Sequence, residues 1–457
     1  MPVSSTRYGN VRARVAVVGV LIAALAVTLA GPNASADGSA SRTVSKARVH
    51  KVKVGHSFFG VHDRYLSSLR RASTGSIRIW DAGTDWATIE PTEGTWNWAP
   101  LDAVVKAAHN NGTAVTLVLG LSPWYAASTP TDAPDPTMYR DYVQAVMERY
   151  RAGHWGYRGI QSYQVWNEAN ISTFWTGTDD ELAEMTRTVH SVRDAVDPGV
   201  RVIGPAMVTR LRFEQKAARA FYSTKLHSTG QPVWKYVDAV SLNLYPTETV
   251  ATSNGGQRPS IPEDAMALLH TMRGFLDDAN VPRSKPIWDT EINYGMGRDA
   301  TDVPISGARQ TANVIRTYLL NAAQGVKQVD WYAYDMGTLP GGGTLGNTLL
   351  TDPRHRAAGT LTRAGKAFTM VQKWMNGTMI GTTTQRPCIK NRQGTYTCKI
   401  KYATRVGRIY WNPFKTVKVR LVSTATRKTN ENGVTSRVTG GSRIKVNFKP
   451  VLVKSKR

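Results

Sequence analysis

Residues 163–175 read YQVWNEANISTFW and place a carboxylate among aromatic side chains at the end of a predicted strand. The aromatic and β-branched residues at the start favour a strand, and the polar residues 167–170 end it. Trp166 and Trp175 offer flat apolar faces for sugar rings, and a carboxyl group against indole rings has a raised pKa, which suits a general acid. Glu168 alone fits an ordinary loop acid equally well, so this interpretation depends on a second carboxylate.

That second carboxylate is Glu291, in the segment PIWDTEINYG at residues 286–295. It closes another predicted strand 123 residues after Glu168, which is three strand-to-strand steps of 41 residues. A barrel of parallel strands gathers its active-site residues at the carboxyl ends of the strands, so the fourth and seventh strands would bring both carboxylates to one mouth. Asp289 shares a face with Glu291 by strand alternation and is an alternative nucleophile.

Predicted strands alternate with amphipathic helical patterns between residues 56 and 376. The strands are expected at residues 58–62, 76–80, 114–119, 162–166, 201–205, 239–245, 286–291 and 329–334. Eight strand–helix units favour an α/β fold of the (β/α)8 TIM barrel type over an open doubly wound sheet. No glycine-rich dinucleotide fingerprint follows the first strand, which weakens the alternative. A helix from about residue 363 to residue 374 would complete the barrel.

The texture of the chain changes after Gly377, where short Val-, Thr- and Lys-rich runs are broken by Gly, Asn and Pro. Residues 377–457 are therefore predicted to form a small antiparallel, β-sandwich-like accessory domain. Its strands are expected near residues 396–402, 408–411, 417–422 and 444–448. Cys388 and Cys398, the two cysteines of the chain, are expected to form a disulfide that closes a short hairpin, and no metal site is expected there.

The C-terminal domain holds most of the positive charge of the chain. It has nineteen Lys and Arg residues against one acid, Glu431, which gives +18 of the total +25. Such a charge would attract anionic cell-wall or extracellular polymers, although it fits a merely solubilising role as well. No recognition motif supports specific nucleic-acid binding.

The N-terminus has the pattern of a secretory signal peptide at residues 1–36. Three arginines precede an apolar run at residues 15–31, and Ala34-Ser35-Ala36 is a cleavage pattern. An uncleaved membrane anchor is the alternative, because the apolar run is slightly long. Residues 37–55 are expected to be a linker, and the protein is expected to be secreted or cell-wall associated, with no membrane contact after cleavage.

The motifs VWNEAN and WDTEINYG resemble those of the retaining (β/α)8 glycoside hydrolases of clan A, and most of all glycoside hydrolase family 39 and its bacterial endo-acting relatives. FGVH at residues 59–62 and WATIEP at residues 86–91 add to the likeness, which covers residues 56–376. The resemblance implies a hydrolase that cleaves O-glycosidic bonds of a poly- or oligosaccharide with two carboxylates and no cofactor. The alternative is a barrel that keeps the sugar cleft as a non-catalytic envelope-binding protein.

The resemblance also implies a role for individual residues. Glu168 would be the acid/base and Glu291 the nucleophile. The substrate-binding residues would be Asn167 for the 2-hydroxyl of the sugar, Arg78 and Tyr245 as partners of Glu291, and Trp331 as the floor of the cleaved sugar's subsite. Arg78 could instead be a salt-bridged structural residue of the barrel.

Further aromatic residues follow predicted strand ends and are candidates for subsite walls. These are Trp124, Tyr125, Trp175 and Tyr294. His62, at the end of the first predicted strand, is expected either to contact a sugar hydroxyl or to be a hydrogen-bonded core histidine.

Overall fold

A computed structural model of the chain describes residues 49–63, 73–156, 158–295, 305–335, 346–352 and 359–456. These residues belong to one compact unit, Arg48–Arg457. The predicted signal peptide at residues 1–36 and the predicted linker up to residue 48 lie outside the described residues. Within the described ranges, no helix has the length and apolar character needed to cross a membrane.

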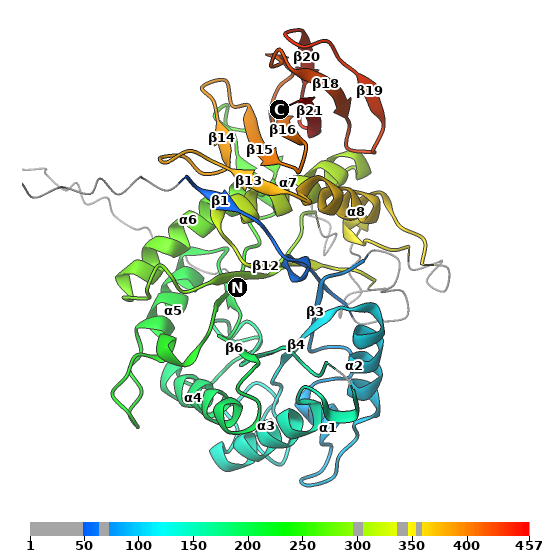
Figure 1. The fold of residues 1–457 in the computed structure, drawn as a ribbon. Coiled ribbons are helices and arrows are strands. Elements are labelled where there is room, and N and C mark those ends of the chain that lie inside the picture. The colour runs from blue at the N-terminus through cyan, green and yellow to red at the C-terminus, as the bar shows by residue number, and fades with distance from the viewer. Residues whose placement is uncertain are drawn as a thin grey trace, which may run out of the picture. The chain divides into compact units, whose positions relative to one another are not determined.

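Parallel strands form a closed barrel, with helices on its outside (Figure 1). The strands are β2 (Phe59–His62), β3 (Ser76–Ile79), β4 (Ala114–Val118), β5 (Ser162–Gln164), β6 (Arg201–Ile203), β8 (Val240–Asn243), β11 (Ile287–Ile292) and β12 (Gln328–Tyr332), with the short β7 (Met207–Val208) beside β8. β12 pairs with β2, and a bridge between Ile203 and Ala239 joins β6 to the start of β8 and closes the ring. The predicted TIM barrel is confirmed.

The helices around the barrel bury the apolar stripes that their sequences predict. They are α1 (Trp86–Ile89), α2 (Ala99–Asn111), α3 (Pro136–Tyr150), α4 (Asp179–Val196), α5 (Arg212–Ser223), α6 (Pro262–Asp278), α7 (Gly307–Gln324) and α8 (Arg363–Met375). Asp135 caps α3 by accepting from the backbone N–H groups of Thr137 and Met138, with Pro136 at the first helical position. α7 ends at Gly325, whose φ of 83° belongs to the left-handed region that glycine adopts without strain.

An antiparallel β domain follows α8, as predicted. Its larger sheet contains β13 (Thr378–Ile380), β14 (Cys388–Lys390), β15 (Tyr396–Lys401), β16 (Arg405–Trp411), β18 (Ala425–Thr429), β19 (Thr435–Arg437) and β21 (Val451–Lys456), and a separate two-stranded ribbon is formed by β17 (Val417–Arg420) and β20 (Arg443–Val446). Cys388 and Cys398 face each other on β14 and β15 and form a disulfide.

One segment of the predicted linker belongs to this sheet. β1 (Lys51–Val52) pairs antiparallel with β13, so the chain enters the C-terminal sheet before it enters the barrel. This corrects the prediction of a linker over residues 37–55 for its described end. This strand could not be predicted from the sequence, because the strand is only two residues long and its partner lies more than 300 residues away.

The barrel and the β domain share one hydrophobic core. Trp411 of β16 is fully buried, stacks on Tyr396 with ring centroids 5.0 Å apart, and donates its indole N–H to Glu263 Oε1 on α6 at 2.7 Å. Arg316 of α7 forms an ion pair with the same glutamate. The β domain therefore covers apolar surface of the outer helices instead of hanging from them on a flexible connection.

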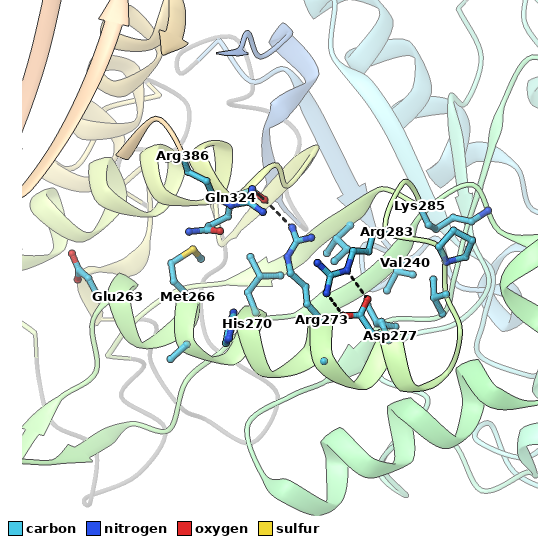
Figure 2. A pocket seen from close by; sticks show the side chains of 17 residues that line it. Val240, Glu263, Met266, His270, Arg273, Asp277, Arg283, Lys285, Gln324 and Arg386 are labelled. Carbon is cyan, nitrogen blue, oxygen red and sulfur yellow. Dashed lines mark hydrogen bonds and ion pairs between the residues drawn. The ribbon is translucent and has the colours of Figure 1, made fainter. Parts of the chain in front are cut away.

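A cavity of about 830 Å³ lies beside α6 and the start of β11 (Figure 2). Arg273 of α6 and Arg386 of the β domain both donate to the backbone carbonyl of Gln324, at the last residue of α7. Arg283 and Asp277 form a two-point ion pair at the rim. Neither Glu168 nor Glu291 lines this cavity, so it is separate from the predicted site.

Candidate active site

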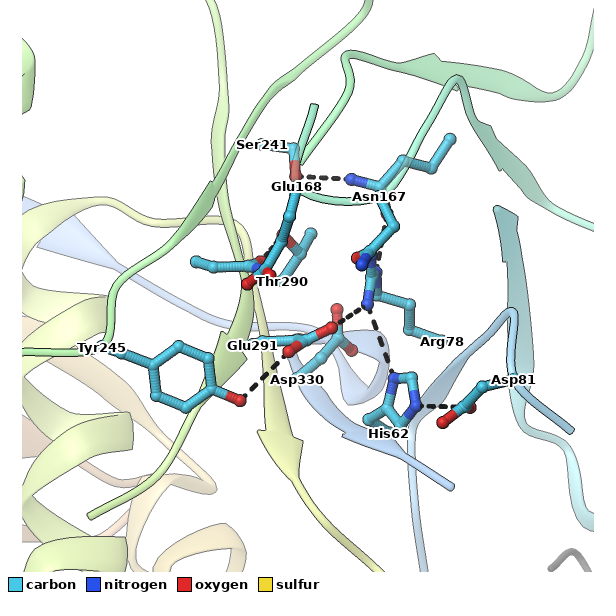
Figure 3. Close-up of polar contacts among 12 residues, drawn as sticks. His62, Arg78, Asp81, Asn167, Glu168, Ser241, Tyr245, Thr290, Glu291 and Asp330 are labelled. Atoms are coloured by element: carbon cyan, nitrogen blue, oxygen red, sulfur yellow. Dashed lines mark hydrogen bonds and ion pairs between the residues drawn. The ribbon is translucent and has the colours of Figure 1, made fainter. Parts of the chain in front are cut away.

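Glu168 and Glu291 lie together at the carboxyl ends of the barrel strands (Figure 3). Glu291 is the next-to-last residue of β11, and Glu168 lies in the loop that follows β5. Glu168 has a φ of 41°, a left-handed conformation that non-glycine residues seldom adopt and that is concentrated at functional sites. The loop thus turns sharply just where the carboxylate enters the mouth.

Arg78 of β3 is a fully buried cation that connects both carboxylate segments. Its Nη1 lies 2.5 Å from Glu291 Oε1, and its Nη2 donates to Asn167 Oδ1 at 2.7 Å. Its Nε donates to Gln164 Oε1 at 2.6 Å, so the whole guanidinium fork is held. A charge-assisted hydrogen bond of this kind fixes a carboxylate more firmly than a neutral one.

Tyr245 approaches Glu291 from the other side. Its hydroxyl lies 3.1 Å from Glu291 Oε2, while Arg78 holds Oε1, as Figure 3 shows. Both oxygens of Glu291 therefore have a protein donor, and the carboxylate has one fixed orientation. Such fixing is what a nucleophile needs, because the attacking oxygen must meet its target carbon along a defined line.

Glu168 has a different environment. Burial in the mouth, and next the negative charge of Glu291, raise the pKa of Glu168 to about 7. Opposing effects come from a hydrogen bond donated by Asn243 at 2.9 Å and from the positive charges of Arg210 and Arg78. A carboxyl group with a pKa near 7 can both give and take a proton at neutral pH.

Asn243 is itself held by a chain of buried hydroxyl groups. Thr290 donates to Asn243 Oδ1 at 2.8 Å, and Ser241 lies 2.6 Å from Thr290 Oγ1. Accepting at Oδ1 orients the amide so that its NH₂ points at Glu168. The arrangement explains why Asn243 acts as a donor to this carboxylate.

His62 is completely buried behind the carboxylates. Its Nε2 lies 2.8 Å from Asp81 Oδ1, and its Nδ1 lies 3.5 Å from Arg78 Nη1. Of the two expectations for His62, the hydrogen-bonded core histidine matches this placement. His62 thus contacts Arg78, which in turn contacts Glu291.

Trp331 does not floor the mouth, which corrects the sequence prediction. It is 0% exposed and donates its indole N–H to the backbone carbonyl of Thr348 at 2.8 Å. Side chains alternate along a strand, and Asp330 faces Ser76 Oγ at 3.4 Å inside the barrel, so Trp331 points outward to the helices. The next residue, Tyr332, faces the mouth instead, with its ring 4.9 Å from His62.

Tyr294 is also absent from the mouth. It is buried, its hydroxyl lies 3.4 Å from Thr317 Oγ1 on α7, and its ring lies 6.2 Å from Trp331. This aromatic pair packs between the barrel and α7. The prediction of a subsite wall at Tyr294 is therefore corrected.

Asp289, the alternative nucleophile, points away from Glu291. It accepts hydrogen bonds from the backbone of Leu244 and from Asn321 Nδ2 on α7, and burial raises its pKa well above the usual range. The pairing of β11 with β12 shifts register between Asp289 and Ile292, so simple alternation fails here. Asp289 and Glu291 consequently do not share a face.

The other aromatic candidates differ sharply in accessibility. Trp124 is 77% exposed and meets Tyr125 edge to face, with centroids 6.0 Å apart. Trp175 is buried against Trp166, with centroids 5.2 Å apart. Trp124 is thus accessible to a ligand, whereas Trp175 belongs to the hydrophobic core, which corrects the prediction of a subsite wall at Trp175.

Three residues of the site escaped the sequence analysis: Asn243, Arg210 and Tyr332. A polar residue at the end of a barrel strand was a usable signal for Asn243, as it was for Asn167. Arg210 follows β7 in a loop with no motif, and its guanidinium lies 5.7 Å from the ring of Tyr245. Tyr332 was missed because the pattern suggested its neighbour.

No group of three or more His, Cys, Asp or Glu residues suited to hold a metal ion occurs within the described ranges. The mouth presents two carboxyl groups, Glu168 and Glu291, together with Arg78, Tyr245 and the amides of Asn167 and Asn243. Pairs of carboxyl groups with different environments divide into an ionised and a protonated member.

Comparison with known proteins places the fold among solved glycosidase structures. The chain resembles a glucosidase from Croceicoccus marinus with a TM-score of 0.62 and 12% identity, over 89% of this chain and 97% of the other. It resembles the GH39 enzyme from Xanthomonas axonopodis pv. citri with a TM-score of 0.59 and 15% identity, over 88% and 95% of the two chains. The chain has the fold of these enzymes. The expected likeness to family 39 is thus met at the level of fold.

A third similar structure is the GH51 arabinofuranosidase from Xanthomonas axonopodis pv. citri, with a TM-score of 0.58 and 10% identity over 90% of this chain and all of the other. No family model and no curated protein sequence matches the chain. The likeness is therefore one of architecture, including the C-terminal β domain, because the alignments cover nearly the whole of both chains.

Proposed function

We propose that this protein is a secreted retaining glycoside hydrolase that cleaves O-glycosidic bonds of a poly- or oligosaccharide. The observation that carries the proposal is the unequal treatment of two carboxyl groups at one barrel mouth. Glu291 is held through both oxygens by Arg78 and Tyr245, whereas burial and the charge of Glu291 raise the pKa of Glu168 to about 7. The first environment suits a nucleophile, and the second suits an acid that later becomes a base.

In the first step, an oxygen of Glu291 attacks the anomeric carbon of the bound sugar. The bond from that carbon to the leaving oxygen breaks, and protonated Glu168 gives its proton to this oxygen. The products are a glycosyl ester on Glu291 and a released alcohol. Asn167, whose Oδ1 accepts a hydrogen bond from Arg78, would bond the 2-hydroxyl of the sugar.

In the second step, water hydrolyses the glycosyl ester on Glu291. Glu291 no longer carries a negative charge, so one cause of the raised pKa of Glu168 is gone and its carboxylate can accept a proton from water. The resulting hydroxide equivalent attacks the anomeric carbon, and Glu291 leaves as a carboxylate. Two inversions at one carbon give net retention.

The surroundings support action on carbohydrate outside the cell. Solved structures of the same fold carry the names glucosidase and arabinofuranosidase, and exposed Trp124 offers a stacking surface. A signal-peptide pattern and the Cys388–Cys398 disulfide suit an oxidising compartment. The basic β domain is proposed to contact anionic wall or extracellular polymers. The non-catalytic alternative has no observation in its favour, since both carboxylates and their partners are present.

The decisive experiment is covalent trapping. The protein is incubated with a panel of 2-fluoro glycosides that carry good leaving groups, and the digested protein is mapped by mass spectrometry. We expect the fluorosugar on the peptide that contains Glu291, and none in the Glu291→Gln variant. Label on another residue, or no label and no hydrolysis across a broad panel of aryl glycosides and polysaccharides, would overturn the proposal.

A further inference from the structure

Cross-strand neighbours in the β domain pair positive charge with positive charge. Residues directly opposite each other on adjacent strands include Lys399 with Arg408, Arg405 with Lys456, Lys418 with Lys445, Arg420 with Arg443, and Arg427 with Arg437. Like charges at directly opposite positions destabilise a sheet, because the side chains leave the backbone only about 5 Å apart. A fold with no use for these pairs gains stability by replacing them.

Two of these like-charge pairs lie next to each other on the ribbon β17–β20. One face of this ribbon packs Val417, Val419, Ile444 and Val446 on the larger sheet. The other face presents Lys418, Arg420, Arg443 and Lys445, and all four are exposed. We call this outer face the cationic ribbon. Strand alternation separates the two faces cleanly, so the four charges form a flat array rather than a scattered surface.

The β domain has no acid to balance the cationic ribbon. Glu431 is the single acidic residue after Gly377, and it is paired with Lys449 Nζ at 3.3 Å. The four side chains are therefore left to repel one another in water. An anionic ligand that lies along the ribbon converts this repulsion into attraction.

We propose that the cationic ribbon binds a linear acidic polysaccharide. This inference rests on the proposed function in one respect: it names the face and the chemistry of the polymer contact suggested there. Successive cations on one strand are about 7 Å apart, and the two rows are about 5 Å apart. Such an array matches anionic groups that repeat along an extended chain.

Carbohydrate fits the cationic ribbon better than the other common polyanions. Grooves that bind single-stranded nucleic acid combine positive charge with aromatic side chains on which the bases stack. The four outward side chains of the ribbon include no aromatic residue. They include no apolar residue to enter a lipid layer, as interfacial membrane surfaces require. Electrostatic attraction to a regular chain of carboxylates or sulfates needs neither aromatic stacking residues nor apolar residues that insert into lipid.

The base of the cationic ribbon lies at the catalytic end of the barrel. Arg258 stacks over Phe414, which precedes β17, at 5.1 Å. Arg258 belongs to β10 (Gln257–Pro259), in the hairpin with β9 (Thr249–Ala251) that follows the carboxyl end of β8. Arg309, in the first turn of α7, stacks over Phe448 after β20 at 4.9 Å. A polymer held on the ribbon therefore stays on the side of the barrel where Glu168 and Glu291 lie.

The test compares full-length variants that lose the same charge at different places. One replaces Lys418, Arg420, Arg443 and Lys445 by glutamine. The control replaces four exposed lysines of barrel helices, namely Lys106, Lys216, Lys366 and Lys373, by glutamine. Binding is measured by affinity electrophoresis in gels that contain polygalacturonate or fully methyl-esterified polygalacturonate, at low and at high salt.

We expect the parent and the control to bind polygalacturonate, and the ribbon variant to bind it about tenfold more weakly or worse. The esterified polymer and high salt should abolish binding of all forms. Melting temperature should stay equal or rise in the ribbon variant, because repulsion is removed. Equal binding by ribbon variant and control, or undiminished binding to the esterified polymer, would overturn the proposal.

Two further measurements distinguish this inference from binding of other polyanions and from the proposed enzyme activity. Tighter binding to single-stranded DNA or to vesicles of anionic lipid than to polygalacturonate would overturn the assignment to carbohydrate. Hydrolysis of a small aryl glycoside is followed in parallel. If no form hydrolyses the glycoside while polymer binding still depends on the ribbon, the proposed enzyme activity fails and the ribbon inference stands. If hydrolysis is intact and polymer binding does not depend on the ribbon, the ribbon inference fails and the proposed activity stands.

Discussion

Arg78 and Glu291 are joined by a 2.5 Å contact between two buried side chains that are 213 residues apart in the sequence. The same guanidinium holds Asn167, the residue before Glu168, so one cation contacts both carboxylate segments. A buried arginine with four polar partners is costly to disturb, because loss of the carboxylate partner leaves an unpaired charge in the interior. The site is thus a rigid unit of the barrel.

Replacement of Glu291 by glutamine should abolish hydrolysis while the fold survives. Glutamine keeps the shape and can still contact Tyr245, but it cannot form the glycosyl ester. We expect kcat to fall by at least about four orders of magnitude, measured with an aryl glycoside that the parent hydrolyses. Circular dichroism and the melting temperature serve as controls for folding. Activity near that of the parent would assign the nucleophile to another residue.

Replacement of Glu168 by alanine should affect substrates unequally. Good leaving groups need no proton, so the glycosyl ester still forms, whereas poor leaving groups should lose about two to four orders of magnitude in rate. Azide is a nucleophile that needs no general base, and it should accelerate turnover of activated substrates and yield a glycosyl azide. Equal losses on both classes of substrate, without azide rescue, would contradict the acid/base role.

The pH dependence should report the pKa of Glu168. An acid must be protonated, so kcat/KM for poor leaving groups should be high below pH 7 and fall as the pH rises through about 7. Asn243 bonds the carboxylate and lowers this pKa, so Asn243→Ala should move the alkaline limb to higher pH. The control is a substrate with a good leaving group, whose rate needs no acid. A limb that stays in place would assign it to another group.

Sequence reasoning located the barrel strands and brought Glu168, Glu291, Arg78 and Tyr245 to one mouth because strand ends carry recognisable polar residues. It failed where one residue decides the outcome. Trp331 and Tyr332 lie on opposite faces of β12, so an error of one position in the prediction assigns a core residue to the mouth of the barrel. The bulge in β11 reverses the direction expected for Asp289, and bulges leave no mark in a single sequence.

The raised pKa of Glu168 predicts a stability cost that depends on pH. Its folded-state pKa of about 7 lies above the usual value of 4.5, so stability is lost as pH rises from about 4.5 through 7. Glu168→Gln removes the ionisable group. Because the carboxyl is partly accessible at the mouth, we expect a gain of about 1–3 kcal/mol in the free energy of unfolding at pH 8 and almost none at pH 4. Urea unfolding at both pH values measures this, and an equal change at the two would refute it.

The last prediction concerns Trp411, which locks the β domain to the barrel. Its indole is fully buried and donates to Glu263, so Trp411→Ala removes a large side chain and leaves a carboxylate oxygen without that donor. We expect a loss of about 3–5 kcal/mol in the free energy of unfolding, measured with guanidinium chloride. Trp411→Phe keeps most of the apolar surface and loses only the N–H, so its cost should be about 1–3 kcal/mol.

The same contact decides how the β domain has to be studied. A chain cut after Gly377 would lose Trp411 and the whole C-terminal sheet, including β13, the partner of β1, and would expose apolar surface of the outer helices. Such a chain should be destabilised whatever the domain binds, so point variants of the cationic ribbon are the cleaner probe. If Trp411→Ala leaves the unfolding midpoint unchanged, the two domains are energetically independent, and truncation becomes a valid test of polymer binding.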